Sequence, residues 1–444
     1  MIETIREMAL SREHILQACA QYHAGLEEET FVPGETYVPV SGKVLNADDL
    51  VHLVDASLDM WLTAGRFSDK FSGALAAFFP LKYVNLTVSG SAANLLAFSS
   101  LTSPKLGDRR IEKGSEVITV AAGFPTTVTP IIQNGCIPVF VDADPRTGNV
   151  DASLIEAAVT PRTRAIMLAH ALGNPFDLEA VMAVAEKHDL YVIEDCCDAL
   201  GATFKGRHVG TFGDIATLSF YPAHHITTGE GGAVLSRHKH ISKQVESFRD
   251  WGRDCWCAPG MDNTCNKRFK WQLGDLPPGY DHKYTYSHVG YNMKLTDMQA
   301  AIGVSQLKKA PSFIAARRRN FAAYTEAFRN SCVEDHLILP EFLPDADPSW
   351  FGYLMTVRDG SPLKRVDILT RLEQRKIGTR LLFAGNLTKQ PAFESVGYRI
   401  SSPLTGTDKI MNDSFWIGVW PGIQDAQRTY VIETLFDVIK ELQG

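Results

Sequence analysis

Short, almost wholly apolar runs recur between residues 83 and 235, each bounded by polar residues or by glycine. Runs of this kind that are rich in Val, Ile and aromatic side chains predict buried β-strands. Because the runs are apolar at nearly every position, both faces of each strand are expected to be covered. The seven predicted strands span residues 83–88, 116–120, 137–141, 165–169, 191–193, 215–220 and 232–235.

Between several of these strands the apolar residues recur at helical spacing instead. Behind Asp177, the residues Leu178, Val181, Met182 and Ala185 fall at positions i, i+3, i+4 and i+7. This is the pattern of an amphipathic helix with Asp177 as its N-cap. Apolar strands that alternate with helices favour a mainly parallel sheet covered on both faces. The sequence therefore predicts the α/β class, with a large domain built on a seven-stranded, mainly parallel sheet.

The pattern changes outside this region. Residues 1–24 predict a peripheral helix, and Ser68 or Asp69 is the predicted N-cap of a second one. Residues 297–329 predict a long helix that is kinked or broken at Pro311, because proline removes a helical hydrogen bond.

Beyond residue 330 strand and helix patterns alternate again, which predicts a smaller C-terminal α+β domain. Its predicted elements are a strand at 350–357, a helix at 366–375 and a strand at 379–383. We therefore divide the chain into an N-terminal helical arm (1–60), a large α/β domain (61–300) and a small C-terminal domain (301–444).

Composition and charge exclude several classes of function. The chain has 444 residues, 45% of them hydrophobic and 21% charged, with a formal net charge of -7, which is typical of a soluble globular protein. No basic stripe suggests nucleic acid as a partner. The arginine run 317–319 favours a solvated helix face, and contact of one of these arginines with a diphosphate is the alternative. No apolar run approaches the roughly 20 residues that cross a bilayer. The first residues lack the layout of a signal peptide, so we expect a cytoplasmic protein.

The most informative segment, residues 219–232, is a polar, glycine-rich turn between two predicted strands, which suits a site better than a core. It contains Ser-Phe, three residues, His224 and a following Gly-Glu-Gly-Gly. This segment resembles that of the pyridoxal-phosphate aminotransferases that act on nucleotide-linked keto sugars. In that family a lysine that holds the cofactor as a Schiff base occupies the place of His224. The resemblance implies aminotransferase fold type I.

The resemblance also implies which residues surround the cofactor. Its phosphate would lie where residues 88–94 end a strand and open a helix, since a helix start suits an anion; small residues there also permit a tight turn. The implied cofactor-binding residues are Gly90, Ser91, Ala92 and Ser219 at the phosphate, Phe124 on the ring, Asp195 at the ring nitrogen, Asp198, and Asn292 reaching the phosphate of a neighbouring subunit. Because Asn292 would reach the cofactor of a neighbouring subunit, the resemblance also implies a homodimer with shared sites.

Two of these residues carry a reason of their own. Asp195 ends an apolar run, and a buried carboxylate is costly without a cationic or hydrogen-bonding partner. A pyridinium nitrogen is such a partner, and helix capping is the alternative role. Phe124 follows a predicted strand and offers an aromatic face, although a lone Phe more often belongs to the core.

His224 decides the chemistry, because an imidazole forms no imine with the cofactor aldehyde. The expected resting cofactor is therefore pyridoxamine 5'-phosphate rather than a tethered pyridoxal phosphate. Histidine still moves protons near neutral pH, so His224 is the candidate catalytic base. His225 is a second candidate, and the register of the motif favours His224. A catalytically silent protein kept for binding is the alternative.

The cysteines form a second pattern. Cys197, Cys255, Cys257 and Cys265 follow one another as Cys-x57-Cys-x1-Cys-x7-Cys, with Cys196 as a spare. In a reducing compartment four such thiolates indicate zinc or an iron–sulfur cluster rather than disulfides. The paired CxxC motifs frequent in structural zinc sites are absent, which favours a cluster slightly.

Histidine at the lysine position together with this array resembles the 3-dehydratases of 3,6-dideoxysugar biosynthesis, which use pyridoxamine phosphate and a [2Fe-2S] cluster. The resemblance implies that Cys197, Cys255, Cys257 and Cys265 bind the cluster. It implies CDP-4-keto-6-deoxyglucose as substrate, which would condense with the cofactor at C4 and lose its C3 hydroxyl after His224 removes a proton. A separate NADH-dependent flavin/iron–sulfur reductase would supply two electrons.

Three alternatives remain open at this point. Related dehydratases act on dTDP-linked sugars, so the nucleotide base is not fixed. A cluster-free dehydratase of the same family would need no external electrons, although the four cysteines speak against it. A silent sugar-nucleotide-binding protein with a structural zinc is the third.

Overall fold

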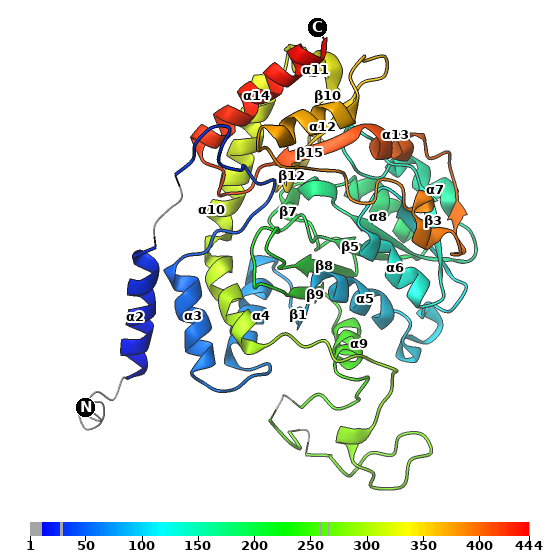
Figure 1. Cartoon of the computed structure of the whole chain (residues 1–444). Helices are drawn as coiled ribbons and strands as arrows, with labels where there is room; N and C mark the ends of the chain where they lie inside the picture. The colour runs from blue at the N-terminus through cyan, green and yellow to red at the C-terminus, as the bar shows by residue number, and fades with distance from the viewer. Residues whose placement is uncertain (1–10, 27–29, 258–259, 265, 444) are drawn as a thin grey trace, which may run out of the picture.

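The computed structural model describes residues 11–26, 30–257, 260–264 and 266–443. Its centre is a sheet of eight strands (Figure 1). In spatial order they are β1 (Tyr83–Thr87), β9 (Gly232–Ser236), β8 (Ile215–Ser219), β5 (Tyr191–Asp195), β4 (Thr163–Ala169), β2 (Glu116–Val120), β3 (Ile137–Val141) and β14 (Arg399–Ile400). Only β9 runs against its neighbours, so the predicted mainly parallel sheet is confirmed.

All seven predicted strands are present, and the eighth comes from far along the sequence. β14 pairs in parallel with β3 through Arg399 and Ile400. Two residues are too short a run to give a strand pattern. The C-terminal part of the chain thus extends the central sheet by one edge strand.

Both faces of the sheet are covered, as near-continuous apolar strands require. In β4, Ile166 and Leu168 belong to one hydrophobic cluster, whereas Ala165 and Met167 belong to another. The helices associated with the sheet are α4 (Arg66–Phe78), α5 (Gly90–Ser100), α6 (Pro125–Gln133), α7 (Ile155–Ala158), α8 (Leu178–Lys187) and α9 (Lys239–Arg249). Asp177 caps α8 by accepting the Ala180 N–H at 3.0 Å, as predicted.

The long helix α10 (Asp297–Phe328) connects two hydrophobic cores. Ala310 and Ile314 pack in the core of the large sheet, and Phe321 and Tyr324 pack in a second core. The helix is continuous through Pro311, so of the predicted kink or break, the break is wrong and the kink stays a prediction. Packing along both halves of the helix outweighs the hydrogen bond that proline removes.

The second core belongs to a C-terminal α+β unit. Its antiparallel sheet has the order β10 (Leu337–Ile338), β12 (Gly352–Val357), β15 (Ser414–Gly418) and β13 (Thr379–Arg380). Its helices are α11 (Cys332–His336), α12 (Arg365–Gln374), α13 (Thr405–Asp413) and α14 (Asp425–Gln443). A third small sheet joins β11 (Ala346–Asp347), β6 (Thr203–Phe204) and β7 (Arg207–His208). The division of the chain at residues 60 and 300 stays a prediction.

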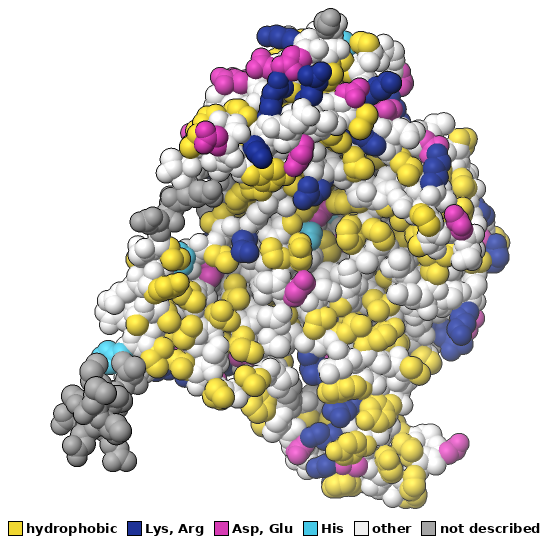
Figure 2. Space-filling model, in the orientation of Figure 1, with side chains coloured by type: hydrophobic (Ala, Val, Ile, Leu, Met, Phe, Trp, Pro, Cys, Tyr) yellow, Lys and Arg dark blue, Asp and Glu magenta, His cyan; other side chains and the backbone are white. Residues whose placement is uncertain are grey.

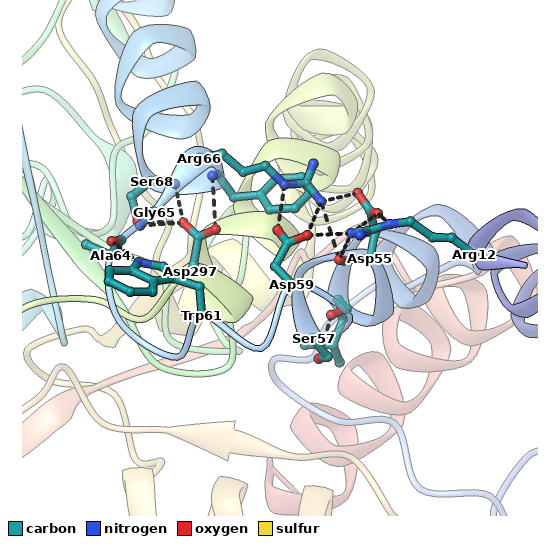
Figure 3. Close-up of polar contacts among 12 residues, drawn as sticks. Arg12, Asp55, Ser57, Asp59, Trp61, Ala64, Gly65, Arg66, Ser68 and Asp297 are labelled. Carbon is teal, nitrogen blue, oxygen red and sulfur yellow. Dashed lines mark hydrogen bonds and ion pairs between the residues drawn. The ribbon is translucent and has the colours of Figure 1, made fainter. Parts of the chain in front are cut away.

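The N-terminal helices α2 (Arg12–Ala24) and α3 (Ala47–Ser57) are joined by charge (Figure 3). Arg12 lies 2.6 Å from an oxygen of Asp55 and 2.7 Å from one of Asp59, and Arg66 contacts the same two carboxylates. α2 has no buried residue. It is therefore a peripheral helix held by ion pairs rather than by a core.

The predicted N-cap of α4 is wrong. The helix begins at Arg66, and Gly65 is its cap residue without a side-chain cap. Asp297 at the start of α10 caps α4 instead, since its carboxylate accepts the N–H groups of Gly65 (2.9 Å) and Ser68 (2.7 Å) (Figure 3). A buried carboxylate at a helix start satisfies its free donors.

Short 3-10 turns complete the chain: η1 (Pro104–Arg109), η2 (Ala152–Leu154), η3 (Ala171–Gly173), η4 (His282–Tyr284), η5 (Leu387–Lys389) and η6 (Pro391–Phe393). Between α9 and α10 a long segment that includes η4 extends away from the sheet, at the bottom of Figure 1. No helix within the described ranges is long and apolar enough to cross a membrane.

Candidate active site

A cavity of about 800 Å³ opens at the carboxyl ends of the parallel strands. Ala169, Asp195 and Ser219, the last residues of β4, β5 and β8, all line it. Open parallel sheets bind their ligands at this edge, because the loops that follow the strands converge there. Most of the residues singled out from the sequence lie around this cavity.

The start of α5 forms one wall. Ser89, Gly90 and Ser91 line the cavity beside Ser219. A Cβ built on Gly90 would lie 2.5 Å from the Cβ of Ser219 and 3.0 Å from the Sγ of Cys197. Only glycine allows this approach, and the resulting cradle presents a helix N-terminus and hydroxyl groups that fit a phosphate.

Ala92 lies outside this wall. Its N–H donates to the Ser89 Oγ at 3.0 Å, and its side chain is buried. Its predicted contact with the phosphate therefore has no direct counterpart among the residues that line the cavity.

Asp195 lies at the base of the cavity and is 5% exposed. Its Oδ2 accepts from Asn94 Nδ2 (2.8 Å) and Thr127 Oγ1 (2.7 Å), and its Oδ1 accepts from the Cys197 N–H (3.1 Å). Within the described ranges no cation pairs with this carboxylate. A buried negative charge of this kind fits a positively charged ring nitrogen.

Sequence reasoning missed Asn94 and Thr127 as partners of Asp195. Both lie in segments singled out from the sequence, 88–94 and 122–127, in the first turns of α5 and α6. A second hydrogen-bond step runs from Thr217 Oγ1 to Asn94 Oδ1 at 2.6 Å. These bonds fix the orientation of the carboxylate.

Phe124 is 50% exposed and lines the cavity at the start of α6. Its ring meets Phe383 edge to face, with centroids 5.8 Å apart and an interplanar angle of 88°. A half-exposed ring held in place by a neighbour offers a flat surface on which an aromatic cofactor can stack.

His224 also lines the cavity, and its Nδ1 lies 3.3 Å from the Asp198 Oδ1. The contact suits an ion pair when the ring is protonated. Behind it, the Phe351 ring packs 5.1 Å from the imidazole. The pair of acid and imidazole can therefore accept a proton from a ligand and stabilise the charge that results.

His225, the second candidate base, faces another way. It is 3% exposed, and its Nε2 lies 2.8 Å from the carbonyl oxygen of Ser349. Burial, together with nearby Arg317, holds the pKa of His225 well below its usual range. It does not line the main cavity, so its position fits a structural role.

Arg317 contradicts the predicted solvated helix face. It is 1% exposed, and burial lowers its pKa to about 9. It donates to the carbonyl oxygens of Trp350 (3.1 Å) and His224 (3.2 Å). The arginine therefore fixes the backbone on both sides of the cavity instead of facing water.

Among the described residues, Cys197 lies in a different cavity from Cys255 and Cys257. Cys197 is partly exposed and lines the main cavity, where burial and the Asp195 carboxylate raise the pKa of its thiol. Cys255 and Cys257 line a separate small cavity within the segment that joins α9 to α10. Cys265 lies outside the described residues.

Among the described residues, one group of three candidate ligands has its atoms within 4.8 Å of one another: His170, Glu194 and Cys196. Glu194 already accepts the N–H groups of Gly210, Phe212 and Gly213 at 2.6–2.9 Å. Its negative charge is thus neutralised by backbone dipoles and His170, so this group is structural.

Asn292 is exposed at the end of the segment between α9 and α10. Its Oδ1 accepts from Lys294 Nζ at 2.7 Å, and it does not line the cavity of its own chain. The predicted contact with a neighbouring subunit stays a prediction.

The remaining wall was not predicted. It comes from the C-terminal unit and from the chain before α3, and its members are Ser41, Phe351, Arg380, Leu381, Phe383 and Trp416. Arg380 adds an exposed cation to this wall. The cavity thus has two places that suit anionic groups. The only feature of the sequence that could have indicated this wall was an arginine inside the predicted strand 379–383.

Comparison with known proteins agrees with this arrangement. The model of the DegT/DnrJ/EryC1/StrS aminotransferase family matches residues 45–436. The lipopolysaccharide biosynthesis protein RfbH of Salmonella typhimurium is 58% identical over 422 residues, which cover 95% of this chain and 96% of that protein. The dTDP-4-dehydro-2,6-dideoxy-D-glucose 3-dehydratase of Saccharopolyspora spinosa is 52% identical over 97% of this chain and 92% of that protein.

Solved structures give the same result at lower identity. The E. coli GDP-4-keto-6-deoxy-D-mannose-3-dehydratase with bound hydrated PLP superposes with a TM-score of 0.80 at 27% identity. The match covers 90% of this chain and 99% of that chain. Fold type I is thereby confirmed.

Proposed function

Because this chain belongs to the DegT/DnrJ/EryC1/StrS aminotransferase family, we propose that it is a pyridoxamine-phosphate-dependent 3-dehydratase of nucleotide-linked 4-keto-6-deoxyhexoses. The observation that carries the proposal is His224, which lines the cavity in the segment where the family has its Schiff-base lysine. No lysine lines this cavity in the described part of the chain. The chain therefore offers an imidazole that moves protons and no amine that would bind the cofactor covalently.

The cavity residues fit the cofactor. When bound, pyridoxamine phosphate supplies an amine that condenses with the C4 ketone of the sugar and a ring that withdraws electrons. The Asp195 carboxylate, fixed by Asn94 and Thr127, would hold the ring nitrogen in its protonated form. The start of α5 and Ser219 would hold the phosphate, and Phe124 would cover one face of the ring.

His224 would carry out the proton transfer. Its imidazole would take up a proton from the cofactor carbon that carries the amine, and Asp198 at 3.3 Å would stabilise the imidazolium. The bound cofactor would supply the electron sink that lets the hydroxyl group on C3 of the sugar leave. A lysine would instead return the proton to the sugar and recapture the cofactor, which gives an amine product.

The substrate is proposed to be CDP-4-keto-6-deoxyglucose, with a dTDP-linked sugar as the alternative. Similarity to a lipopolysaccharide biosynthesis protein supports a role in 3,6-dideoxysugar formation, and the dTDP-sugar 3-dehydratase supports the alternative base. Net removal of the C3 oxygen needs two electrons. We propose that a separate NADH-dependent flavin/iron–sulfur reductase supplies them and that the working unit is a homodimer.

A [2Fe-2S] cluster is the proposed entry point for these electrons, on the spacing of Cys197, Cys255, Cys257 and Cys265. The three predicted ligands that the structure describes do not form one site as they stand, because Cys197 lines one cavity and Cys255 and Cys257 line another. The steps derived above therefore use no cluster.

The test is turnover with a defined cofactor. Purified protein is incubated with pyridoxamine phosphate and either CDP-4-keto-6-deoxyglucose or its dTDP counterpart, with and without a chemical reductant. Mass spectrometry follows loss of the C3 oxygen from the sugar. Dehydration of one substrate supports the proposal and identifies the nucleotide. Tight binding of both sugars without any conversion would favour the silent binding protein.

A further inference from the structure

Arg317 has an unusual position for an arginine. It lies on α10 between Ile314, which packs in the core of the large sheet, and Phe321, which packs in the C-terminal core. It is 1% exposed, although arginine side chains are almost never fully buried unless they are paired. Figure 2 shows Lys and Arg side chains on the outer surface of the C-terminal unit instead, mixed with Asp and Glu. Arg317 is therefore a buried charge at the junction of the two cores.

Ion pairing does not account for this burial. Within the described ranges no carboxylate forms an ion pair with Arg317. Burial lowers the pKa of Arg317 and Asp198 raises it in part, yet Asp198 contacts His224 rather than the arginine. A buried charge without a partner carboxylate costs stability, and an apolar side chain of similar volume is often at least as stable in its place. The stability of the core therefore does not explain the guanidinium.

The hydrogen bonds of Arg317 go to backbone carbonyl oxygens behind the cavity wall. Its Nη2 donates to the carbonyl oxygens of His224 (3.2 Å) and Ala223 (3.5 Å), and its Nη1 donates to that of Trp350 (3.1 Å). Trp350 precedes Phe351, whose ring packs 5.1 Å from the His224 imidazole. A planar fork of donors holds several acceptors in fixed directions. One side chain thus joins the turn of the proposed base to the segment that packs against it.

The turn that carries His224 has few other connections at this point. The His224 N–H donates to the Tyr221 carbonyl oxygen at 2.9 Å, which is a bond within the turn itself. In the described part of the chain, no group other than Arg317 donates to the carbonyl oxygens of Ala223 and His224. The next connection comes one residue later, where His225 contacts the Ser349 carbonyl oxygen. Arg317 is therefore the group that attaches this part of the turn to the wall.

We propose that Arg317 is a positioning residue for the proton transfer, which fixes the His224 imidazole against Asp198 and Phe351 by holding the backbone of the turn. Arg317 does not line the cavity, so it acts through His224 rather than on a ligand. The inference rests on the proposed function for the reaction that His224 carries out, but the position of the imidazole is tested without substrate or cofactor.

Arg318, the next residue of α10, provides a matched comparison. It donates to the carbonyl oxygens of Pro348 (2.9 Å) and Asp347 (3.3 Å), and it pairs with the Asp347 carboxylate at 2.9 Å. It thus holds the segment before β12, as Arg317 does, but it makes no bond to the His224 turn. An effect seen at position 317 and not at position 318 belongs to that turn.

Two substitutions at position 317 separate geometry from folding. Arg317→Met keeps much of the volume without the charge or the donors, and Arg317→Lys keeps the charge but replaces the fork by a single ammonium group. Arg318→Met is the control. Melting temperature and binding of pyridoxamine phosphate show that each variant is folded and holds the cofactor. We expect the cofactor affinity of all three variants to stay within about 3-fold of the wild type, since Arg317 and Arg318 lie outside the cavity lining.

The first test uses the apoprotein. It is treated with diethyl pyrocarbonate, and mass spectrometry of a digest compares modification of His224 with that of the exposed His14. A ring released from Asp198 and Phe351 is more accessible, so Arg317→Met should raise the relative rate at His224 by at least about 3-fold and Arg317→Lys by less. Arg318→Met should leave the rate unchanged. An unchanged or lower rate in both Arg317 variants, or an equal rise in Arg318→Met, would overturn the proposal.

The second test is the rate of dehydration. Displacement of a catalytic group by about 1 Å can cost roughly 10²-fold in rate. We therefore expect kcat to fall by about 100-fold in Arg317→Met and by less in Arg317→Lys, with KM for the sugar nucleotide within about 3-fold of the wild type. A higher KM at unchanged kcat would show that Arg317 binds the substrate. Equal loss of kcat in Arg318→Met would show a general loosening of the wall, and either result overturns the proposal.

The two proposals fail in different ways. Wild-type protein without dehydratase activity refutes the proposed function, and the reaction of the apoprotein with diethyl pyrocarbonate still decides whether Arg317 positions His224. Active wild-type protein with no change in either measurement at position 317 refutes only the positioning role. If Arg317→Met does not fold, Arg317→Lys carries both measurements.

Discussion

At the residue scale, one imidazole decides what the cavity can do. In the family, a lysine at the position of His224 both holds the cofactor and returns protons to the product. A histidine can still transfer protons, but it cannot bind the cofactor covalently. Asp198 lies 3.3 Å from its Nδ1, and Arg317 donates to its backbone carbonyl. On the proposed function, one side chain therefore alters the chemistry of a cavity whose other residues fit the cofactor.

Changing His224 to Asn should remove elimination and spare the cofactor. We expect turnover to fall by about 10²–10⁴-fold, since the amide cannot accept the proton. Binding of pyridoxamine phosphate, followed by its absorbance and fluorescence, should change little because the phosphate and ring contacts lie elsewhere.

His225→Gln is the matched control for this prediction. His225 is buried and contacts the Ser349 carbonyl, so its replacement should lower the melting temperature while the folded protein keeps its activity. Full activity in His224→Asn, or greater loss in His225→Gln, would reassign the base.

A larger side chain at position 90 should weaken cofactor binding. A Cβ there would overlap Ser219, so Gly90→Ala should narrow the phosphate cradle and weaken cofactor binding by more than about 10-fold. Titration of the purified apoprotein with the cofactor measures the change in affinity.

Gly73→Ala in α4 provides the control, because nothing lies within 4 Å of a Cβ built there. Alanine in an exposed helix should be neutral or stabilising by about 0.5–1 kcal/mol. Unchanged cofactor affinity in Gly90→Ala would mean that the phosphate binds elsewhere.

At the element scale, the strands were predictable because their signals are local: each of the seven is a short apolar run. The residues Gly90, Phe124, Asp195, Ser219 and His224 were singled out by resemblance to a family, and the structure places all of them around one cavity. β14 and the Asp297 cap of α4 were not predictable. Both depend on partners more than 200 residues away, and no nearby residue announces such a pairing.

Glu116 is another long-range connection between elements. It is fully buried at the start of β2 and binds Arg162 (2.5 Å), Thr160 (2.8 Å) and Arg399 of β14 (2.8 Å). Burial alone would raise the pKa of Glu116, but the hydrogen bonds from Arg399 and Thr160 lower it overall. The carboxylate thus ties the edge strand to the rest of the sheet.

Glu116→Gln should reduce the free energy of unfolding by about 1–3 kcal/mol at pH 7. Because the folded-state pKa of Glu116 is depressed, its stabilising effect is present above the unfolded value of about 4.3 and is lost as the pH falls through the folded value. Urea unfolding should show the two proteins converging below pH 4. Glu112→Gln, in an exposed pair with Arg110, should change stability little at either pH.

At the scale of the whole molecule, the parts that the sequence left unpredicted are those that join distant units. Arg380 and Trp416 reach the cavity only because the C-terminal unit packs over the sheet, and no pattern around them indicates it. The cysteine spacing predicted a common site, yet one folded chain leaves Cys197 apart from Cys255.

The residues proposed to carry out dehydration line the main cavity, whereas Cys255 and Cys257 lie in the segment between α9 and α10, called here the cysteine unit. This separation leads to a last prediction. Cys257→Ala should leave dehydration intact, because His224, Asp195 and the phosphate cradle lie outside its segment. Exchange of the C3 oxygen with labelled water should therefore persist at the wild-type rate. Net reduction with the physiological donor should fall by more than about 100-fold, along with the visible absorption between about 400 and 550 nm that dithionite bleaches.

Cys332→Ala provides the comparison, since Cys332 lies at the start of α11 and packs beside the C-terminal core. It should keep iron, sulfide and both half-reactions. If Cys257→Ala loses oxygen exchange together with reduction, the cysteine unit supports the fold of the cavity rather than electron delivery. If it loses neither, the electrons enter by another route, and a protein that holds one zinc and no iron would identify that unit as a structural metal site.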